Sequence, residues 1–176
     1  MNCTIRAWRT SDAADLAAAV NNPNILRNLR DGLPYPYTVA DAEAYIAAVL
    51  SAAPDKTYAF AIAVEDRAVG SIGVFRQTNI HSRTAEIGYY LAEPYWGKGL
   101  GTSAVRQACA WIFAHTDILR IYAEPFASNA ASCRLLEKAG FVCEGLMRSN
   151  AVKNGRILDM KLYALLREDS RLEARL

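Results

Sequence analysis

The sequence predicts an α/β fold of mixed character, in which one sheet carries helices on both faces. Apolar residues recur with a helical period in residues 10–50, whereas residues 58–92 alternate like strands and are broken by short turns. Beyond residue 100, helical and strand-like segments follow one another. This order predicts an antiparallel meander that continues into a βαβ unit, whose two strands are parallel. With 176 residues, 52% of them hydrophobic and 22% charged, we expect a single domain over residues 1–176.

The first half is expected to hold one strand and three helices. Residues 3–8 have a strand-like pattern, and Thr10-Ser-Asp12 can cap a helix that ends before an Asn-Asn-Pro sequence. A short second helix is expected around residues 25–29. The prolines of residues 31–37 predict an irregular aromatic loop. The next helix, residues 38–50, opens with a Thr-x-x-Asp sequence that is similar to a capping box.

The second half is expected to hold strands, two tight turns and two helices. One helix follows Gly101, and the other starts at Ser128-Asn129 and is stopped by Gly140. Glu65-Asp-Arg67 and Lys153-Asn-Gly155 are typical of hairpin turns. The remaining segments have strand-like patterns: residues 58–65, 68–77, 84–92, 118–124, 141–150 and 156–165.

The segment with the strongest chemical signal is Tyr95-Trp-Gly-Lys-Gly-Leu-Gly-Thr102, at the start of a predicted helix. Its three glycines have no Cβ, so main-chain N–H groups can approach a bulky anion closely. The first turn of a helix leaves N–H groups unpaired and carries the positive end of the helix dipole. We therefore expect this turn to bind a phosphate group of a phosphorylated cofactor.

Two known phosphate-binding sequence patterns match this turn only in part. A Walker A loop needs Gly-Lys followed by Ser or Thr, whereas Lys98 is followed by Gly99. The looser G-x-G-x-x-A dinucleotide pattern is present in residues 99–104, with Glu124 placed as a ribose-binding acid. However, residues 94–96 separate the strand from the glycines, and a three-stranded meander is foreign to a doubly wound sheet. Because the glycine pattern matches but its surroundings do not, a dinucleotide-dependent oxidoreductase is kept as an alternative of lower rank.

Composition argues against several other classes of function. A net charge of +2 is too small for a nucleic-acid-binding groove, and no apolar stretch approaches the ~20 residues that cross a bilayer. The charged N-terminus lacks the apolar core of a signal peptide. The four cysteines contain no C-x-x-C pair and are accompanied by only two histidines. We therefore expect no metal site and a reducing, cytoplasmic location.

Several ordered motifs together resemble one enzyme family. They are Glu86-Ile-Gly-Tyr-Tyr-Leu91, Tyr95-Trp-Gly-Lys-Gly-Leu-Gly-Thr102, Ser128-Asn-Ala-Ala-Ser132 and Leu135-Leu-Glu-Lys-Ala-Gly-Phe141, with Pro34-Tyr-Pro-Tyr-Thr38 upstream and Asn154-Gly-Arg156 downstream. The chain thereby resembles the GNAT acetyltransferases, and most of all the ribosomal-protein alanine or serine N-acetyltransferases. The resemblance implies a mostly antiparallel, twisted sheet with a central pair of parallel strands that splay apart. It also implies acetyl transfer from acetyl-CoA to an amine, either a protein N-terminus or a small molecule.

Carried onto this sequence, the resemblance implies where the cosubstrate binds. The diphosphate of CoA would lie on the backbone N–H groups of Trp96, Gly97, Lys98, Gly99, Leu100, Gly101 and Thr102. The pantetheine arm would pair with the strand at Tyr89, Tyr90 and Leu91 and would meet Asn129. Ser132, on the same helical face as Asn129, would reach the thioester with its hydroxyl. Asn129 can instead cap its helix, and Ser132 can instead bond to local backbone.

The implied chemistry needs a base, an oxyanion donor and a proton for the leaving thiolate. Glu86 is the candidate base, because it precedes the cofactor-binding part of its strand; alternatively, it is a sheet carboxylate paired with Arg83. A backbone N–H near residues 90–91 would stabilise the oxyanion. Many relatives carry a tyrosine as the proton donor where this chain has Leu136, so that role falls to water or to Ser132.

These patterns do not identify the amine acceptor. Tyr35, Tyr37 and a loop from Asn150 to residue 154 are expected to line the acceptor entrance. An acyl-CoA-binding sensor without catalysis is a further hypothesis, supported by Leu136. The chain is expected to act as a monomer or a homodimer, with acetyl-CoA as cosubstrate and without a metal.

Overall fold

The structure, a computed structural model, describes residues 1–53 and 55–169. Its strands are β1 (Thr4–Arg6), β2 (Thr57–Val64), β3 (Arg67–Arg76), β4 (Thr84–Leu91), β5 (Arg120–Ala123), β6 (Val142–Lys153) and β7 (Arg156–Leu166). Its α-helices are α1 (Ala13–Val20), α2 (Pro23–Leu26), α3 (Val39–Ser51), α4 (Leu100–His115) and α5 (Ala130–Lys138). Short 3₁₀ turns are η1 (Thr10–Asp12), η2 (Asn79–His81) and η3 (Glu93–Tyr95).

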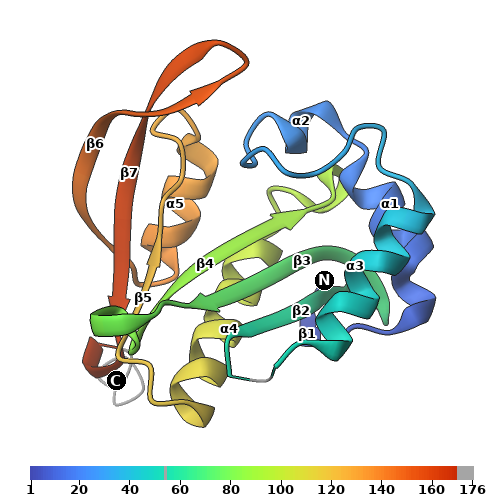
Figure 1. Ribbon diagram of the computed structural model, residues 1–176, viewed down its shortest axis with the longest axis horizontal. Helices are drawn as coiled ribbons and strands as arrows, with labels where there is room; N and C mark the ends of the chain where they lie inside the picture. The colour runs from blue at the N-terminus through green and yellow to red at the C-terminus, as the bar shows by residue number, and fades with distance from the viewer. Residues whose placement is uncertain (54, 170–176) are drawn as a thin grey trace.

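The strands form one mixed sheet in the order β1-β2-β3-β4-β5-β7-β6 (Figure 1). Neighbouring strands are antiparallel except for β4 and β5, which run parallel. These two pair over three residues each: residues 84–86 of β4 lie beside residues 120–122 of β5. β4 continues to Leu91 without a partner on that side, so the two strands diverge beyond Glu86. This confirms the expected mostly antiparallel sheet with a central, splayed parallel pair.

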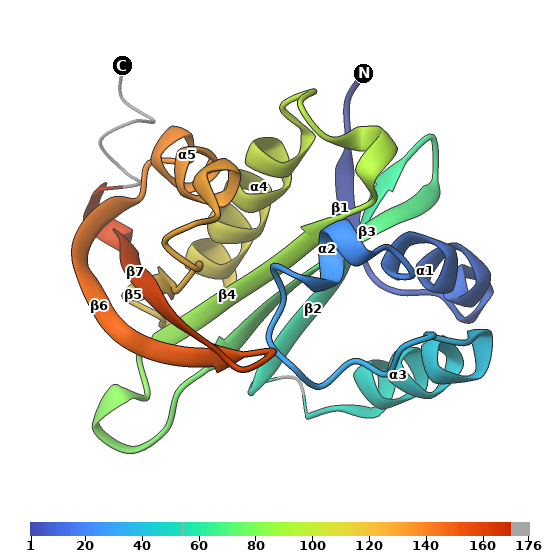
Figure 2. The same cartoon turned by 90° about the horizontal axis from the view of Figure 1, so that it is seen from above.

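Helices cover both faces of the sheet, as predicted (Figure 2). α4 and α5 pack on one face over a core that includes Ile87 and Leu91 of β4. α1 and α3 pack on the other face over a smaller core. This core includes Tyr37, and Tyr90 of β4 packs against it. Successive side chains of a strand point to opposite faces. β4 therefore contributes to both cores with alternate residues.

The N-terminal elements differ from the prediction at their ends. The first strand is confined to Thr4–Arg6, and Thr10–Asp12 is a 3₁₀ turn that precedes the start of α1 at Ala13. The expected side-chain cap from this turn is wrong, because the Arg6 guanidinium engages the Asp12 carboxylate at 2.7 and 2.8 Å. This ion pair is largely buried, and its hydrogen bonds hold the pKa of Asp12 below the ordinary value.

Local signals elsewhere set the element ends as predicted, with one exception. Thr38 and Asp41 form the expected capping box at the start of α3. Asn154-Gly155 forms a two-residue turn with positive φ at both residues and joins β6 to β7, which is the geometry that a tight hairpin requires. The exception is that β6 continues as a strand to Lys153. The expectation of a loop after Asn150 is therefore wrong, because its residues pair with β7.

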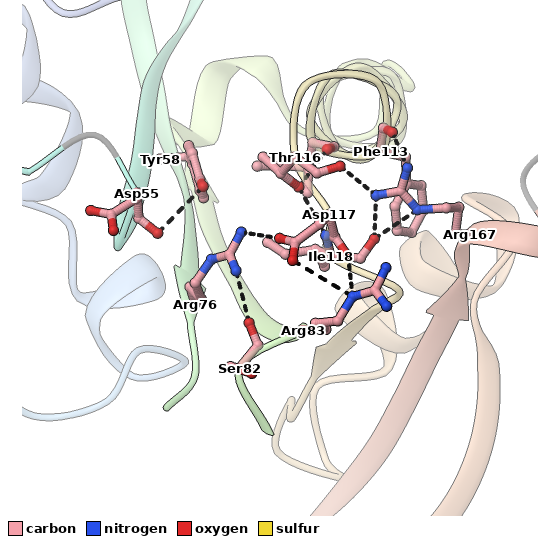
Figure 3. A network of polar contacts seen from close by, with 11 residues as sticks. Asp55, Tyr58, Arg76, Ser82, Arg83, Phe113, Thr116, Asp117, Ile118 and Arg167 are labelled. Atoms are coloured by element: carbon pink, nitrogen blue, oxygen red, sulfur yellow. Dashed lines mark hydrogen bonds and ion pairs between the residues drawn. The ribbon is translucent and has the colours of Figure 1, made fainter. Parts of the chain in front are cut away.

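A polar network holds together the end of the sheet at which β4 and β5 are paired (Figure 3). The Arg167 guanidinium, just after β7, donates to carbonyl oxygens of residues 113–118 at 2.5–2.8 Å. The Asp117 carboxylate lies 2.6 Å from the Arg76 guanidinium and 3.6 Å from that of Arg83. These contacts tie the connection between α4 and β5 to β3, β4 and β7. The parallel pair is thus held at this end and opens at the other.

Within the described ranges, no helix has the length and apolar character that crossing a membrane requires. The same residues contain no group of three or more His, Cys, Asp and Glu side chains that could hold a metal ion. Cys3, Cys109 and Cys133 are buried, Cys143 is exposed, and all are free thiols.

Candidate active site

A cleft of about 1340 Å³ opens where β4 and β5 diverge. Its walls come mainly from the segment after α1, the end of β4, the turn before α4, the start of α5 and the tip of the β6–β7 hairpin. Glu86, most of the glycine turn, Asn129 and Ser132 all line it. The residues that the sequence singled out from separate motifs therefore face one cavity.

The free edge of β4 supplies backbone groups to this cleft. The N–H of Ala92 donates to Val69 O at 2.8 Å. Hydrogen-bonded pairs alternate along an antiparallel ladder, so the N–H of Tyr90 also faces β3, while those of Tyr89 and Leu91 face the gap. Of the two expected oxyanion donors, residues 90 and 91, only Leu91 directs its N–H into the cleft.

The glycine turn presents a row of free backbone donors. The backbone N–H of Trp96 already donates to Glu93 O at 3.0 Å, and the Trp96 indole N–H donates to Leu91 O at 2.6 Å. In the described part of the chain, no hydrogen bond uses the N–H groups of residues 97–102. Gly97 and Gly99 have φ of +72° and +76°, and a Cβ on either would meet no heavy atom within 4 Å. The space before these amides is open, as a bulky anion requires.

Two members of the turn have other contacts. α4 starts at Leu100, so Gly101 lies inside the first helical turn and not ahead of the helix as predicted. A Cβ on Gly101 would lie 2.6 Å from Leu135 Cδ1, so this glycine lets α4 approach α5 closely. The Lys98 ammonium donates to Pro94 O at 2.8 Å and does not line the cleft.

Asn129 and Ser132 stand at the start of α5. The Asn129 side-chain oxygen accepts the Ser132 N–H at 3.1 Å and so caps the helix, while its NH₂ group has no partner among the described residues. The Ser132 hydroxyl lies 2.8 Å from the Tyr89 hydroxyl. Burial raises the pKa of Tyr89, so its phenol stays neutral. Leu136, at the position where many relatives have a tyrosine, is fully buried in the core.

Glu86 lies on the opposite face of β4 and is held by an arginine. Arg30, from the segment after α2, donates to both Glu86 oxygens, at 2.5 and 3.3 Å, and to Glu124 at 3.0 Å. Burial raises the pKa of Glu86; the Arg30 cation opposes this shift and the Glu124 carboxylate adds to it. Glu86 is thus a salt-bridged carboxylate, as the alternative interpretation had it, but its partner is Arg30 and not Arg83, which contacts Asp117.

The acceptor side agrees in part with the sequence-based expectation. Tyr37 lines the cleft, whereas Tyr35 is 64% exposed and lies outside the lining. Asn150 also lies outside it. Of the segment from residue 150 to 154, Lys153 and Asn154 do line the cleft. The Lys153 ammonium donates to Leu29 O at 2.6 Å and to the Asp31 carboxylate at 2.9 Å. The tip of the hairpin is thereby fixed to the segment after α2 (Figure 2).

Sequence reasoning missed the side chains of Arg30 and Tyr89, and it did not foresee the contacts of Lys153, which belongs to the segment expected at the acceptor entrance. Arg30 and Lys153 contact groups 56 and more than 100 residues away, and no local pattern could pair them. Tyr89 could have been found. It alternates with Glu86 along the strand, so its side chain points to the other face, towards the helix that carries Ser132.

The splayed sheet and the glycine turn in its gap define a class of protein that is already known. The family model for the acetyltransferase (GNAT) domain matches residues 2–142. The chain belongs to the GNAT acetyltransferase family.

Individual relatives agree with this assignment. Probable N-acetyltransferase YjcK of Bacillus subtilis (strain 168) is 38% identical over 117 residues, which cover 65% of each protein. Ribosomal-protein-serine acetyltransferase of Escherichia coli (strain K12) is 29% identical over 105 residues, 60% of this chain and 58% of that protein. The chain thus matches about three fifths of these relatives' length. The structure of Mycobacterium smegmatis RimJ in complex with CoA-disulfide shares the fold, with a TM-score of 0.85, 23% identity and coverage of 98% of this chain and 88% of that one.

Proposed function

We propose that this chain transfers an acetyl group from acetyl-CoA to a primary amine by direct attack in a ternary complex. One observation carries the proposal. Free backbone donors for a diphosphate and a partly buried carboxylate lie in the same cleft, on either side of the exposed edge of β4. The first is suited to a CoA thioester, and the second to an amine that must lose a proton.

The residues present fit the cosubstrate. Residues 97–102 offer free N–H groups at a helix start to the diphosphate. Lys98, directed away from the cleft in the free protein, would contribute there only after its side chain turns. The NH₂ of Asn129 and the edge of β4 at Tyr89–Leu91 offer partners for the amides of the pantetheine arm.

Glu86 is the proposed base. An aliphatic amine has a pKa near 10, so little of it is free base at neutral pH. The Glu86 carboxylate, whose pKa is raised by burial, takes the proton from the ammonium directly or through water. The amine lone pair then attacks the acetyl carbonyl carbon, and the C–S bond breaks.

The other face of β4 serves the leaving group. The N–H of Leu91 is directed into the gap, where it can donate to the oxyanion that develops on the carbonyl. The Ser132 hydroxyl, held by the Tyr89 hydroxyl at 2.8 Å, can donate to the departing thiolate sulfur. The nitrogen loses its second proton as the amide forms, and this proton reaches the thiolate through Ser132 or water, which gives the CoA thiol. Leu136 takes no part in this scheme.

Release of the CoA thiol on mixing acetyl-CoA with a panel of peptides, polyamines, amino sugars and amino acids tests the proposal. Glu86→Gln should lower turnover more at neutral pH than near pH 10, where the amine loses its proton unaided. Glu144→Gln is the matched control, since Glu144 is also paired with an arginine, Arg120, but lies outside the cleft. Tight acetyl-CoA binding with no turnover of any amine would favour the sensor hypothesis instead.

A further inference from the structure

The mouth of the cleft on the acceptor side is ringed by cationic side chains. Arg27 and Arg30 line it from the segment that includes α2, and Lys153 and Arg156 line it from the β6–β7 hairpin. The two sides are joined by the contacts of the Lys153 ammonium with Leu29 O and the Asp31 carboxylate. An acceptor that enters here passes between the two arginine-bearing segments.

The carboxylates at this mouth are already paired. Glu86 and Glu124 both accept hydrogen bonds from Arg30. Asp31 accepts one from Lys153 at 2.9 Å. An incoming ammonium group must therefore compete with a cation of the protein for each of these carboxylates.

Arg27 and Arg156 are in the opposite condition. Both are exposed, and neither makes an ion pair or a side-chain hydrogen bond within the residues that the structure describes. Hydrogen bonds from the amides of Asn22 and Asn24 lower the pKa of Glu93, and the nearby Arg27 charge adds to this shift without forming an ion pair. The unpaired charges at the mouth are thus both positive.

We propose that the acceptor is a primary amine that also carries carboxylate groups, and that Arg27 and Arg156 receive them. This inference rests on the proposed acetyl transfer and specifies its substrate class. A guanidinium presents a planar fork of donors that matches a carboxylate. A polyamine, by contrast, would bring several positive charges to a mouth whose described residues include two unpaired guanidinium groups and no unpaired carboxylate. Such a molecule is expected to be a poor acceptor.

The experiment compares kcat/KM, measured by CoA thiol release, for three amidated tetrapeptides: Ser-Asp-Asp-Ala, Ser-Ala-Ala-Ala and Ser-Lys-Lys-Ala. Free glutamate and spermidine complete the set. The acidic peptide should exceed the neutral one by about fivefold or more, as expected for one or two exposed charge pairs, and the basic peptide and spermidine should be slowest. The advantage should shrink at about 0.5 M salt, because exposed pairs are screened. If glutamate is acetylated as fast as the acidic peptide, the natural acceptor is a small acidic amine. If the acidic peptide is acetylated and glutamate is not, the natural acceptor is a polypeptide with an acidic N-terminal segment.

Variants connect the preference to the two arginines. In the Arg27→Gln and Arg156→Gln double variant, the ratio of kcat/KM between the acidic and the neutral peptide should fall to about one. Arg148→Gln is the control, because Arg148 is an exposed arginine of the same hairpin that lies outside the cleft. Equal rates for all three peptides, or a preference for spermidine, would overturn this inference and leave acetyl transfer standing. Absence of thiol release from every acceptor would overturn both.

Discussion

Gly99→Asp tests whether the glycine turn binds CoA. Gly99 has φ +76°, and a Cβ there would meet no heavy atom within 4 Å, so the free protein has room for a side chain. The left-handed backbone costs a non-glycine residue about 1–2 kcal/mol. For a chain of this size, that cost corresponds to a decrease in Tm of about 2–8 °C. The variant is therefore expected to fold.

The effect on CoA binding should be much larger. A carboxylate about 5 Å from the diphosphate, at an effective dielectric constant of ~20, is repelled by about 3 kcal/mol. Each backbone contact that is displaced removes a further ~0.3–1 kcal/mol. Since every ~1.4 kcal/mol is a factor of ten, the affinity for CoA should fall by about 100-fold or more.

A second glycine separates strain from binding. Gly155, in the β6–β7 turn, has φ +72° and equally open space at its Cβ. Gly155→Asp should lose similar thermal stability but bind CoA as the wild type does, which isothermal titration calorimetry measures directly. Undiminished CoA affinity in Gly99→Asp, or an equal loss in both variants, would refute the assignment of the diphosphate to this turn.

Three further perturbations have defined outcomes. Ser132→Ala and Tyr89→Phe should each lower kcat about tenfold with little change in the KM for acetyl-CoA, as expected for loss of one hydrogen bond. The double variant should be no slower than Ser132→Ala alone, since Tyr89 acts through that hydroxyl; additive losses would contradict this. Arg30→Gln removes the cation that lowers the pKa of Glu86, so the acid limb of the pH profile of kcat/KM should move to higher pH, and an unmoved limb would exclude Glu86 as the base. Asp12→Asn breaks a largely buried ion pair and should destabilise the protein by about 3 kcal/mol at pH 7. Because the pKa of Asp12 is depressed by folding, that stability is present above the ordinary pKa of about 4 and is lost as pH falls below it; urea unfolding at pH 7 and pH 3 should show the two proteins converge.

The fold could be predicted largely because its signals are local. Alternation placed the strands, the Thr-x-x-Asp sequence placed α3, and an Asn-Gly pair placed the last hairpin. One error arose where a residue outside the local pattern took a group that the pattern had assigned elsewhere. Asp12 has the side chain of a helix cap, but Arg6 binds its carboxylate.

The candidate site shows the same division. The glycine turn and the position of Glu86 were legible, because backbone freedom and strand parity follow from neighbouring residues. The Arg30 bridge between Glu86 and Glu124 spans 56 and 94 residues of sequence, and its donor lies in a segment without regular pattern. Only the folded chain brings these three side chains together.

The division of labour along β4 makes its alignment with β3 critical. A slip of one residue would turn Glu86 towards α5 and Tyr89 towards Arg30, so the base and the group that holds Ser132 would exchange places together. Gly70 of β3 marks where such a slip is resisted, because a Cβ there would lie 2.3 Å from Tyr90 O. Gly70 is paired with Leu91, so a slip would bring Val69 or Ser71 opposite Leu91, where its Cβ would collide with the Tyr90 carbonyl; the observed alignment is the one that places the glycine there.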